Sequence, residues 1–297
     1  MNLNRNKRLV IFFCFLSLCL LLQCTHSKNL NSSKEYKTIF IDDFNDVKLD
    51  QDKWNIEITG RNVNNELQAY VDSQNTIYIA HGKEAEGAIN GALVLQQRFT
   101  PGFKTHDGRT FDFISGRINT RNKFQFKYGT AEARIKLTVG SGLWPAWWIL
   151  GNGKWPDTGE VDVMEYVGEK DWASAAVHGP GYSGETPFVG RKSFSKNNDA
   201  TQWHIYGVDW TPDSLIFKYD NTIVYTVSKQ MVEKYGSWSF DNDKFLILNY
   251  AIGGAYPIKL NHVKQPYYGL PLKTVDSIKN NRAKMLIDWV RVKKRIE

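Results

Sequence analysis

The sequence predicts an all-β fold, an antiparallel sandwich, because alternating runs recur along it and glycine and proline separate them. In residues 131–139 (AEARIKLTV) small or apolar residues alternate with polar ones, as in a half-buried strand. Such runs recur over residues 38–297, and no internal repeat or low-complexity block interrupts them. This is typical of one domain built from two packed sheets. Strong twist would give one sheet a concave face that suits a long polymer.

A β-hairpin is expected in the C-terminal half of the chain. Residues 215–219 and 222–227 form two alternating runs, and Asp220-Asn221 lies between them. Asp and Asn both tolerate the positive φ of a tight hairpin turn.

Two further strands and one helix complete the expected elements. Residues 245–250 and 284–292 are the expected strands. The one helix expected lies near 274–284, where Val275, Ile278 and Asn281 could share a face.

The first 23 residues have the features of a signal peptide. Arg5, Lys7 and Arg8 precede an apolar run over residues 9–22. A basic head followed by about 14 apolar residues predicts a signal peptide, since a membrane span needs about 20.

The end of this segment, Leu21-Leu22-Gln23-Cys24, resembles the bacterial lipobox, in which the cysteine is lipidated and becomes the mature N-terminus. The resemblance implies an exported protein anchored to a bacterial membrane through Cys24. Ordinary secretion after a cut nearby is the alternative. Residues 24–37 are polar and indicate a flexible tether, so the catalytic domain is expected at 38–297.

The three cysteines all lie within the first 24 residues. Cys14 and Cys19 lie inside the signal and Cys24 at its end, so the body of the protein has none. An exported domain without disulfides must be stabilised by its own core.

The charge balance gives little support to nucleic-acid binding. Removal of residues 1–23 takes away three positive charges and no negative ones, so the net charge falls from +7 to about +4. The remaining charges are interspersed, with no basic stripe.

The aromatic content indicates a carbohydrate ligand. The chain has ten Trp, fourteen Tyr and sixteen Phe, several of them beside Gly and Pro in expected loops. Sugar-binding clefts use such rings, because the apolar face of a pyranose packs flat on them. Most of these residues are nevertheless expected to fill the core.

Three acidic residues lie within six positions, at Glu160, Asp162 and Glu165, interleaved with Val and Met. In a regular strand the first two would share one face and Glu165 would point to the other. One extra residue, a β-bulge at Val163 or Met164, would bring all three to one face. The two Glu carboxyl groups would then lie about 5 Å apart, the separation of a retaining glycosidase.

Neither a solvated strand nor a calcium site accounts well for these acids and their neighbours. A solvated strand rarely pairs acids with such apolar residues. A calcium site would better suit a loop with Asn and Gly than a β-branched strand. Catalysis is therefore the favoured interpretation.

The longer segment from Gly142 to Val167 (GLWPAWWILG, then WP, then GEVDVMEYV) resembles glycoside hydrolase family 16, laminarinase type, the endo-1,3-β-glucanases. NNELQ at 64–68, SGRINT at 115–120 and HGPGYSG at 178–184 also match. The resemblance covers nearly all of residues 38–297. It implies a β-jelly-roll sandwich of two curved antiparallel sheets, a substrate cleft on the concave face, and double displacement with retention.

The resemblance also assigns roles. Glu160 would be the nucleophile and Glu165 the acid/base, with Asp162 between them to orient Glu160 and tune its protonation. One side chain of the adjacent pair Trp147 and Trp148 is expected to be buried, because neighbours on a strand face opposite ways. The positions matched to substrate binding are Trp144, Trp148, Trp155, Glu66, Arg117 and His178.

Two segments depart from the family pattern, at residues 83–92 and 256–283, and either could alter the subsites. The family often carries a structural calcium away from the cleft, and Asp288 occupies the position of one of its ligands. No cofactor is required for the chemistry.

The leading hypothesis is a monomeric endo-1,3-β-glucanase whose partners are a β-glucan and, through the anchor, a membrane. A 1,3-1,4-β-glucanase or a galactan hydrolase of the same family is the alternative. A transglycosylase would share the chemistry, whereas a lectin-like sugar-binding module would need neither Glu160 nor Glu165.

Overall fold

The computed structural model describes residues 36–59 and 63–296. The predicted signal peptide, Cys24 and most of the predicted tether lie outside the described residues. The first strand, β1, spans Tyr36–Asp42 and so begins two residues before the expected start of the domain at 38. It begins there because Tyr36 already pairs with Arg295 of the last strand.

The larger sheet has eight strands, and the C-terminal strand β18 lies at its centre. Strand β1 pairs with one part of β18, beside the main order of the sheet. That order is β16 (Thr222–Ser228), β15 (Ser214–Tyr219), β14 (His204–Trp210), β9 (Gly129–Lys136), β18 (Lys284–Arg295), β5 (Ala92–Gln96) and β4 (Ile77–Ala80).

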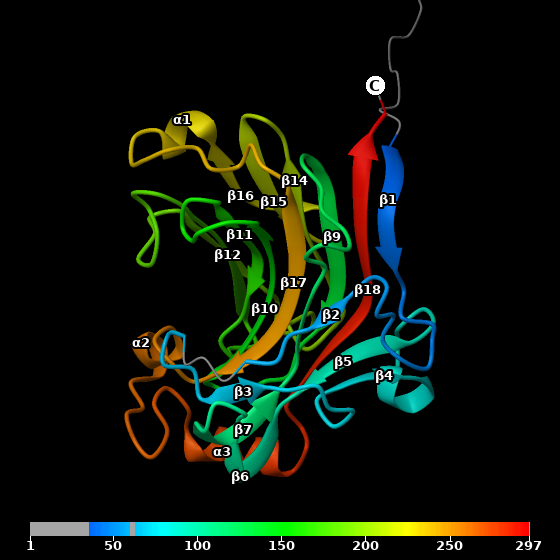
Figure 1. The fold of residues 1–297 in the computed structure, drawn as a ribbon, viewed down its shortest axis with the longest axis vertical. Helices are drawn as coiled ribbons and strands as arrows, with labels where there is room; N and C mark the ends of the chain where they lie inside the picture. The colour runs from blue at the N-terminus through cyan, green and yellow to red at the C-terminus, as the bar shows by residue number, and fades with distance from the viewer. Residues whose placement is uncertain (1–35, 60–62, 297) are drawn as a thin grey trace, which may run out of the picture. The chain divides into compact units, whose positions relative to one another are not determined.

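A second, seven-stranded antiparallel sheet packs against it, and a small three-stranded sheet lies at one end (Figure 1). The seven-stranded sheet has the order β13 (Val189–Ser193), β12 (Trp172–His178), β11 (Glu160–Glu165), β10 (Leu143–Gly151), β17 (Lys244–Ile252), β8 (Arg117–Asn119) and β2 (Asn55–Ile56). The small sheet has β3 (Gln68–Tyr70), β7 (Thr110–Ser115) and β6 (Arg98–Lys104).

The expected all-β sandwich is confirmed, and the alternation in the sequence explains it. In β9, Ala131, Ala133 and Ile135 are buried in the core between the two large sheets. The hairpin between β15 and β16 turns at Asp220 and Asn221, which have φ values of 49° and 64°.

The seven-stranded sheet is curved, and its hollow side faces away from the eight-stranded sheet (Figure 1). Its other side contributes apolar side chains of β10, β11 and β17 to the core, including Ile149, Val161 and Leu248. The hollow side is therefore free to carry polar and aromatic residues. Within the described residues, no helix combines the length and the apolar character needed to cross a lipid bilayer.

The expectation of one helix was incomplete. Helix α3 spans Leu272–Lys279, and it buries Val275 and Ile278 as predicted. It ends earlier than 284, and Asn281 follows it with a φ of 58°. Two further helices, α1 (Lys229–Val232) and α2 (Pro257–Asn261), are four and five residues long, too short to show a helical period in the sequence. A 3₁₀ turn, η1, spans Gly82–Ala85.

Lys244, at the start of β17, is a buried cation that holds the chain just before β11. Its ammonium group donates to the backbone oxygens of Thr158, Gly159 and Ser239, and to Oδ1 of Asn242 at 3.0 Å. Burial lowers the pKa of Lys244 to about 7. These bonds fix the backbone from which Glu160 follows.

The segment 83–92 lies against the eight-stranded sheet, on the face opposite the core. Trp203 Nε1 donates to the oxygen of Glu86 at 3.0 Å, and the amide of Ile89 donates to Oδ1 of Asp288 at 2.8 Å. In the part of the chain that the structure describes, no hydrogen bond or ion pair joins it to the three acids of β11. The segment therefore covers Asp288 and does not form part of the carboxylate site.

Asp288 does not fit the role of a calcium ligand. Its side chain is fully buried, and Arg134 Nη1 lies 2.5 Å from Oδ2 and 2.9 Å from the oxygen of Gly87. Since the amide of Ile89 occupies Oδ1, both carboxylate oxygens have partners within the chain. The guanidinium supplies the positive charge that a calcium ion would supply. The expectation of calcium at Asp288 is therefore not supported.

Removal of divalent ions should leave the melting temperature of the protein unchanged, whereas Arg134→Ala should lower the free energy of unfolding by about 3 kcal/mol. The loss follows because a buried carboxylate would lose its charged partner. The variant would expose the Asp288 and Gly87 oxygens to solvent ions, so added Ca²⁺ should restore part of the loss. Thermal melts with chelator and with Ca²⁺ measure both effects.

Arg291→Ala is the matched control. Arg291 pairs with Glu132, which also receives Lys293, so this change leaves that carboxylate with a partner. The control variant should melt closer to the parent and should not respond to Ca²⁺. A clear fall in the melting temperature of the parent on chelation would contradict the assignment of Arg134.

Candidate active site

The three acids of β11 share one face because the strand contains one extra residue. Trp147 of β10 pairs with Met164, and the next residue, Trp148, pairs with Asp162, so Val163 has no partner. The register of β11 with β12 shifts at the same place, between Asp162 and Glu165. The predicted β-bulge is confirmed. Val163 and Met164 both enter the core, which turns Glu165 to the side of Asp162.

Glu160 lies at the start of β11 beside an indole and an imidazole. Trp155 Nε1 donates to Oε2 of Glu160 at 3.1 Å, and His178 Nε2 lies 4.0 Å from Oε1. The Trp155 side chain is 47% exposed, so its ring is available to a ligand and is not part of the core.

Glu165, at the end of β11, has a second indole as its partner. Trp144 Nε1 donates to Oε1 of Glu165 at 3.1 Å. The Trp144 ring packs edge-on against Tyr256, with 5.6 Å between the ring centroids. Tyr256 OH lies 3.3 Å from Ser174 Oγ. The segment 256–283 therefore reaches the site through its first residue, Tyr256.

Asp162 lies between the two glutamates and is buried. The imidazole of His178 lies beside it, with Nε2 3.3 Å from Oδ2. Among the described residues, neither Asp162 Oδ2 nor His178 Nδ1 has a hydrogen-bond partner. His178 thus faces the carboxylates of Glu160 and Asp162 at once, and among the described residues it makes a hydrogen bond to neither.

Burial and mutual repulsion favour protons on these carboxyl groups. Burial, followed by the charge of Asp162, raises the pKa of Glu160 and the pKa of Glu165 to about 8. Burial also raises the pKa of Asp162 to about 8. Because like charges at this spacing repel, the three groups cannot all be ionised near neutral pH. The site therefore retains at least one proton near neutral pH, as general acid chemistry requires.

Trp148 occupies the same face one strand away. Its neighbour Trp147 is fully buried, so the expected division of the pair is confirmed. Trp148 Nε1 donates to Asn249 Oδ1 at 2.7 Å, and Arg117 Cζ lies 5.0 Å from the centre of the Trp148 ring.

Glu66 joins this group through Tyr70. Tyr70 OH lies 3.4 Å from Glu66 Oε2 and accepts from Asn249 Nδ2 at 2.9 Å. Gln68 also donates to Glu66, at 2.8 Å. The structure thus brings Glu66, Arg117 and Trp148 into one network, and Trp144, Trp155 and His178 into contact with the acids.

Several residues at the site were not predicted. Tyr70, Ser174, Asn249 and Tyr256 join the networks above, and Lys244 supports the backbone before Glu160. Only Asn249 had a signal, since it is a polar residue inside the apolar run of β17. The others depend on pairings between distant segments, which the local sequence does not reveal.

Glu160, Asp162 and His178 could also hold a metal ion. One ligand atom from each lies within 4.8 Å of the others. Two carboxylates and an imidazole suit a divalent transition metal. An ion there would engage the carboxylate of Glu160 and compete with any reaction at that oxygen.

Paired carboxylates among partly exposed indole rings, on the curved face of an antiparallel sheet, define a carbohydrate-cleaving enzyme. The model of the family "Glycosyl hydrolases family 16" matches residues 51–253. The chain belongs to this family, and it is a glycoside hydrolase.

Three relatives illustrate the similarity. A β-glucanase of Rhodothermus marinus is 30% identical over 271 residues, which cover 86% of this chain and 90% of that protein. The structure of an endo-β-1,3-glucanase from Pyrococcus furiosus has a TM-score of 0.74 at 30% identity, covering 90% of this chain and 97% of that one. The laminarinase catalytic domain from Thermotoga maritima has a TM-score of 0.72 at 29% identity, covering 89% and 100%. These neighbours support the expected jelly roll.

Asp162→Asn should move both limbs of the pH profile of kcat/KM to lower pH. Removal of this charge removes the second-largest cause of the raised pKa at Glu160 and at Glu165. Both groups would then titrate at lower pH. Initial rates on a glucan substrate between pH 4 and 9 measure the shift.

The same change should alter the pH dependence of folding. A carboxyl group whose pKa is raised in the folded state stabilises the fold fully below its unfolded pKa, and this stabilisation disappears as pH rises through the folded pKa. For this cluster the loss falls between about 4 and about 8. Asp162→Asn should make this loss of stability with rising pH shallower, whereas the control Asp209→Asn, on the other sheet, should not.

An unchanged pH profile of kcat/KM in Asp162→Asn would show that Asp162 does not tune the glutamates.

Proposed function

We propose that the protein is a retaining endo-1,3-β-glucanase that acts on laminarin-like polysaccharides. The observation that carries this proposal is the bulged strand β11, which presents Glu160 and Glu165 on one face with Asp162 between them. The activities named for the β-glucanase, endo-β-1,3-glucanase and laminarinase relatives support the choice of substrate.

In this mechanism Glu160 attacks the anomeric carbon while Glu165 protonates the departing glycosidic oxygen. The nucleophile must be ionised, and the indole N–H of Trp155 stabilises its negative charge. When Glu160 forms the glycosyl ester it loses that charge, so its repulsion of Glu165 ends and the pKa of Glu165 falls. Glu165 can then take a proton from the incoming water, which hydrolyses the ester.

The surrounding residues would bind the sugar rings. Trp144, Trp148 and Trp155 offer aromatic faces, and Glu66, Arg117 and His178 offer hydrogen bonds to hydroxyl groups. Asp162 acts as a positioning residue, since its charge sets the protonation of both glutamates. Neither the first nor the second step requires a cofactor.

We further propose that residues 38–297 form the catalytic domain of a monomer exported through the leader 1–23. Lipidation of Cys24 would then hold it at a bacterial membrane through the tether 24–37. The proposed export and lipid anchoring are inferred from the sequence of residues 1–37. Labelling with a fatty-acid analogue should mark the parent and not Cys24→Ser, and an unlabelled parent would favour ordinary secretion.

A panel of polysaccharides tests the substrate. Laminarin should be cleaved internally to a ladder of short oligosaccharides, with mixed-linkage glucan cut more slowly. Agarose and carrageenan should remain intact, and chromatography of the products distinguishes these outcomes. Cleavage of agarose alone would refute the glucanase proposal and leave the fold and the carboxylate pair as they are.

The two glutamates should respond differently to removal and to azide. Glu165→Ala lacks the acid, so polysaccharide hydrolysis should fall by about 10² to 10⁴-fold, whereas an activated aryl glycoside should still form the intermediate. Azide can enter the vacated space and attack that intermediate, which yields a β-glycosyl azide.

Glu160→Ala should be inactive on both substrates, because no ester can form. Azide attacking directly from the vacated face would give the α-glycosyl azide. Nuclear magnetic resonance of the adducts therefore assigns each residue. Exchange of the two adducts between the variants would reverse the roles, and full activity in both variants would exclude this strand as the site.

A further inference from the structure

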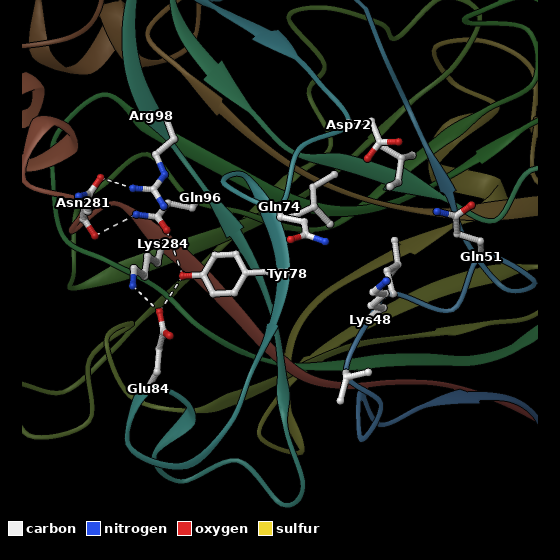
Figure 2. Close-up of a pocket in the computed structure, with 14 residues that line it drawn as sticks. Lys48, Gln51, Asp72, Gln74, Tyr78, Glu84, Gln96, Arg98, Asn281 and Lys284 are labelled. Atoms are coloured by element: carbon white, nitrogen blue, oxygen red, sulfur yellow. Dashed lines mark hydrogen bonds and ion pairs between the residues drawn. The ribbon is translucent and has the colours of Figure 1, made fainter.

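A second cavity, of about 890 Å³, lies away from the three acids, beside the terminal strand β4 of the eight-stranded sheet (Figure 2). Its lining comes from the segment after β1, from β2, from β4 and its flanks, from β5 and β6, and from Asn281 and the start of β18. No residue of β11 contributes to it. The volume is within the range of about 300 to 1,000 Å³ that is common for small-ligand sites.

One wall of this cavity is built around the ring of Tyr78. Tyr78 OH lies 2.7 Å from Glu84 Oε1 and 3.0 Å from Gln96 Oε1. Lys284 Nζ contacts the same oxygen of Glu84 at 2.5 Å. Figure 2 shows the phenol group pointing into this cluster. The cluster fixes the ring in one position before any ligand arrives.

A second pair of side chains extends the same wall. Arg98 donates through Nε to the oxygen of Asn75 at 2.7 Å and through Nη1 to Asn281 Oδ1. Gln96 Nε2 donates to the oxygen of Asn281 at 3.1 Å. The amides and the guanidinium are thus held by the chain at fixed positions.

The opposite side of the cavity carries polar side chains that are not committed to partners. Lys48, Gln51, Asp72 and Gln74 line it, and all four are exposed. Within residues 36–59 and 63–296, no hydrogen bond or ion pair engages any of these four side chains. Figure 2 shows them apart from the Tyr78 cluster. Their donors and acceptors are available to a ligand.

The lining favours a ligand that is uncharged and rich in hydroxyl groups. Three cationic and two anionic side chains line the cavity, and Glu84 already pairs with one of the cations, so no strong field of either sign remains. The uncharged polar groups are amides and the Tyr78 hydroxyl, which pair readily with hydroxyl groups. A fixed aromatic ring beside such groups is the combination that the carboxylate site also offers to sugars.

We propose that this cavity is a second glycan-binding site, which holds a further stretch of the polysaccharide while the carboxylate site cuts it. The ligand is a neutral β-glucan segment, and this choice rests on the proposed function. The two sites belong to one compact domain, so occupancy of the second raises the local concentration of substrate at the first. Glu84 is already engaged by Lys284 and by Tyr78 OH, so the role proposed for this second site is binding and not cleavage.

The test compares binding to insoluble 1,3-β-glucan with hydrolysis of short soluble oligosaccharides. Asp72→Ala combined with Gln74→Ala removes two uncommitted side chains with little effect on folding. In an otherwise inactive Glu160→Gln chain, this double change should weaken adsorption to the insoluble glucan by about fivefold to tenfold, roughly the effect of losing two hydrogen bonds. In the active chain, it should leave kcat/KM on short soluble oligosaccharides within about twofold of the parent, because one short ligand cannot occupy both sites.

Matched variants distinguish this effect from a general change of the surface. Asp213→Ala combined with Gln230→Ala removes the same two side-chain types near the β15–β16 end of the sheet and should not change adsorption. Tyr78→Ala should weaken adsorption, whereas Tyr78→Phe keeps the ring and should retain it. Melting temperatures identify any variant that is unfolded. If a Tyr78 variant does not fold, the Asp72 and Gln74 double variant still decides whether the cavity binds the glucan.

The outcomes separate the second site from the proposed function. If the parent cleaves laminarin and the Asp72 and Gln74 variant adsorbs like the parent, the second site is wrong and the glucanase proposal stands. If the parent neither cleaves nor adsorbs to 1,3-β-glucan, the proposed function is wrong and this ligand falls with it. Loss of adsorption together with unchanged cleavage of the soluble oligosaccharides supports the second site.

Discussion

The active site depends on one unpaired residue in a β-strand. Without the bulge at Val163, the two-residue period of β11 would place Glu165 in the core and Met164 among the acids. The packing between the sheets enforces the bulge, because Val161, Val163 and Met164 all fill the core with apolar side chains. A regular strand would bury a carboxylate there, at a cost of several kcal/mol, by order of magnitude. Core packing thus determines the geometry of the carboxylates.

A buried cation fixes the other end of this strand. Lys244 binds three backbone oxygens, two of them in Thr158 and Gly159 immediately before Glu160. A buried carbonyl oxygen is costly to leave without a donor, and the Lys244 ammonium group supplies that donor to all three. The contact therefore holds this backbone in one conformation. The bulge therefore sets the position of Glu165, and Lys244 sets that of Glu160, relative to the same sheet.

The sequence was sufficient for the sandwich, the hairpin at Asp220 and the bulge, since each leaves a local pattern of alternation or turn residues. It was also sufficient to identify the acids, because three of them interrupt an otherwise apolar strand. It could not place Tyr256 against Trp144 or Lys244 under Thr158, because these contacts join segments that are more than 80 residues apart. It suggested a metal at Asp288, since only the fold shows that Arg134 reaches the carboxylate.

The contrast between buried charges across the domain is itself evidence for function. Asp42 accepts from Trp54 and from the amide of Phe44, and Asp288 accepts from Arg134 and Ile89, so both have good partners. Asp162 is as deeply buried, yet one of its oxygens has no hydrogen-bond partner in the described chain. A structural carboxylate would be expected to acquire a donor there, because its absence destabilises the fold. Burial, followed by the charge of Asp162, raises the pKa of Glu160 and of Glu165 and so keeps protons bound there at neutral pH, which is the property that general acid catalysis requires.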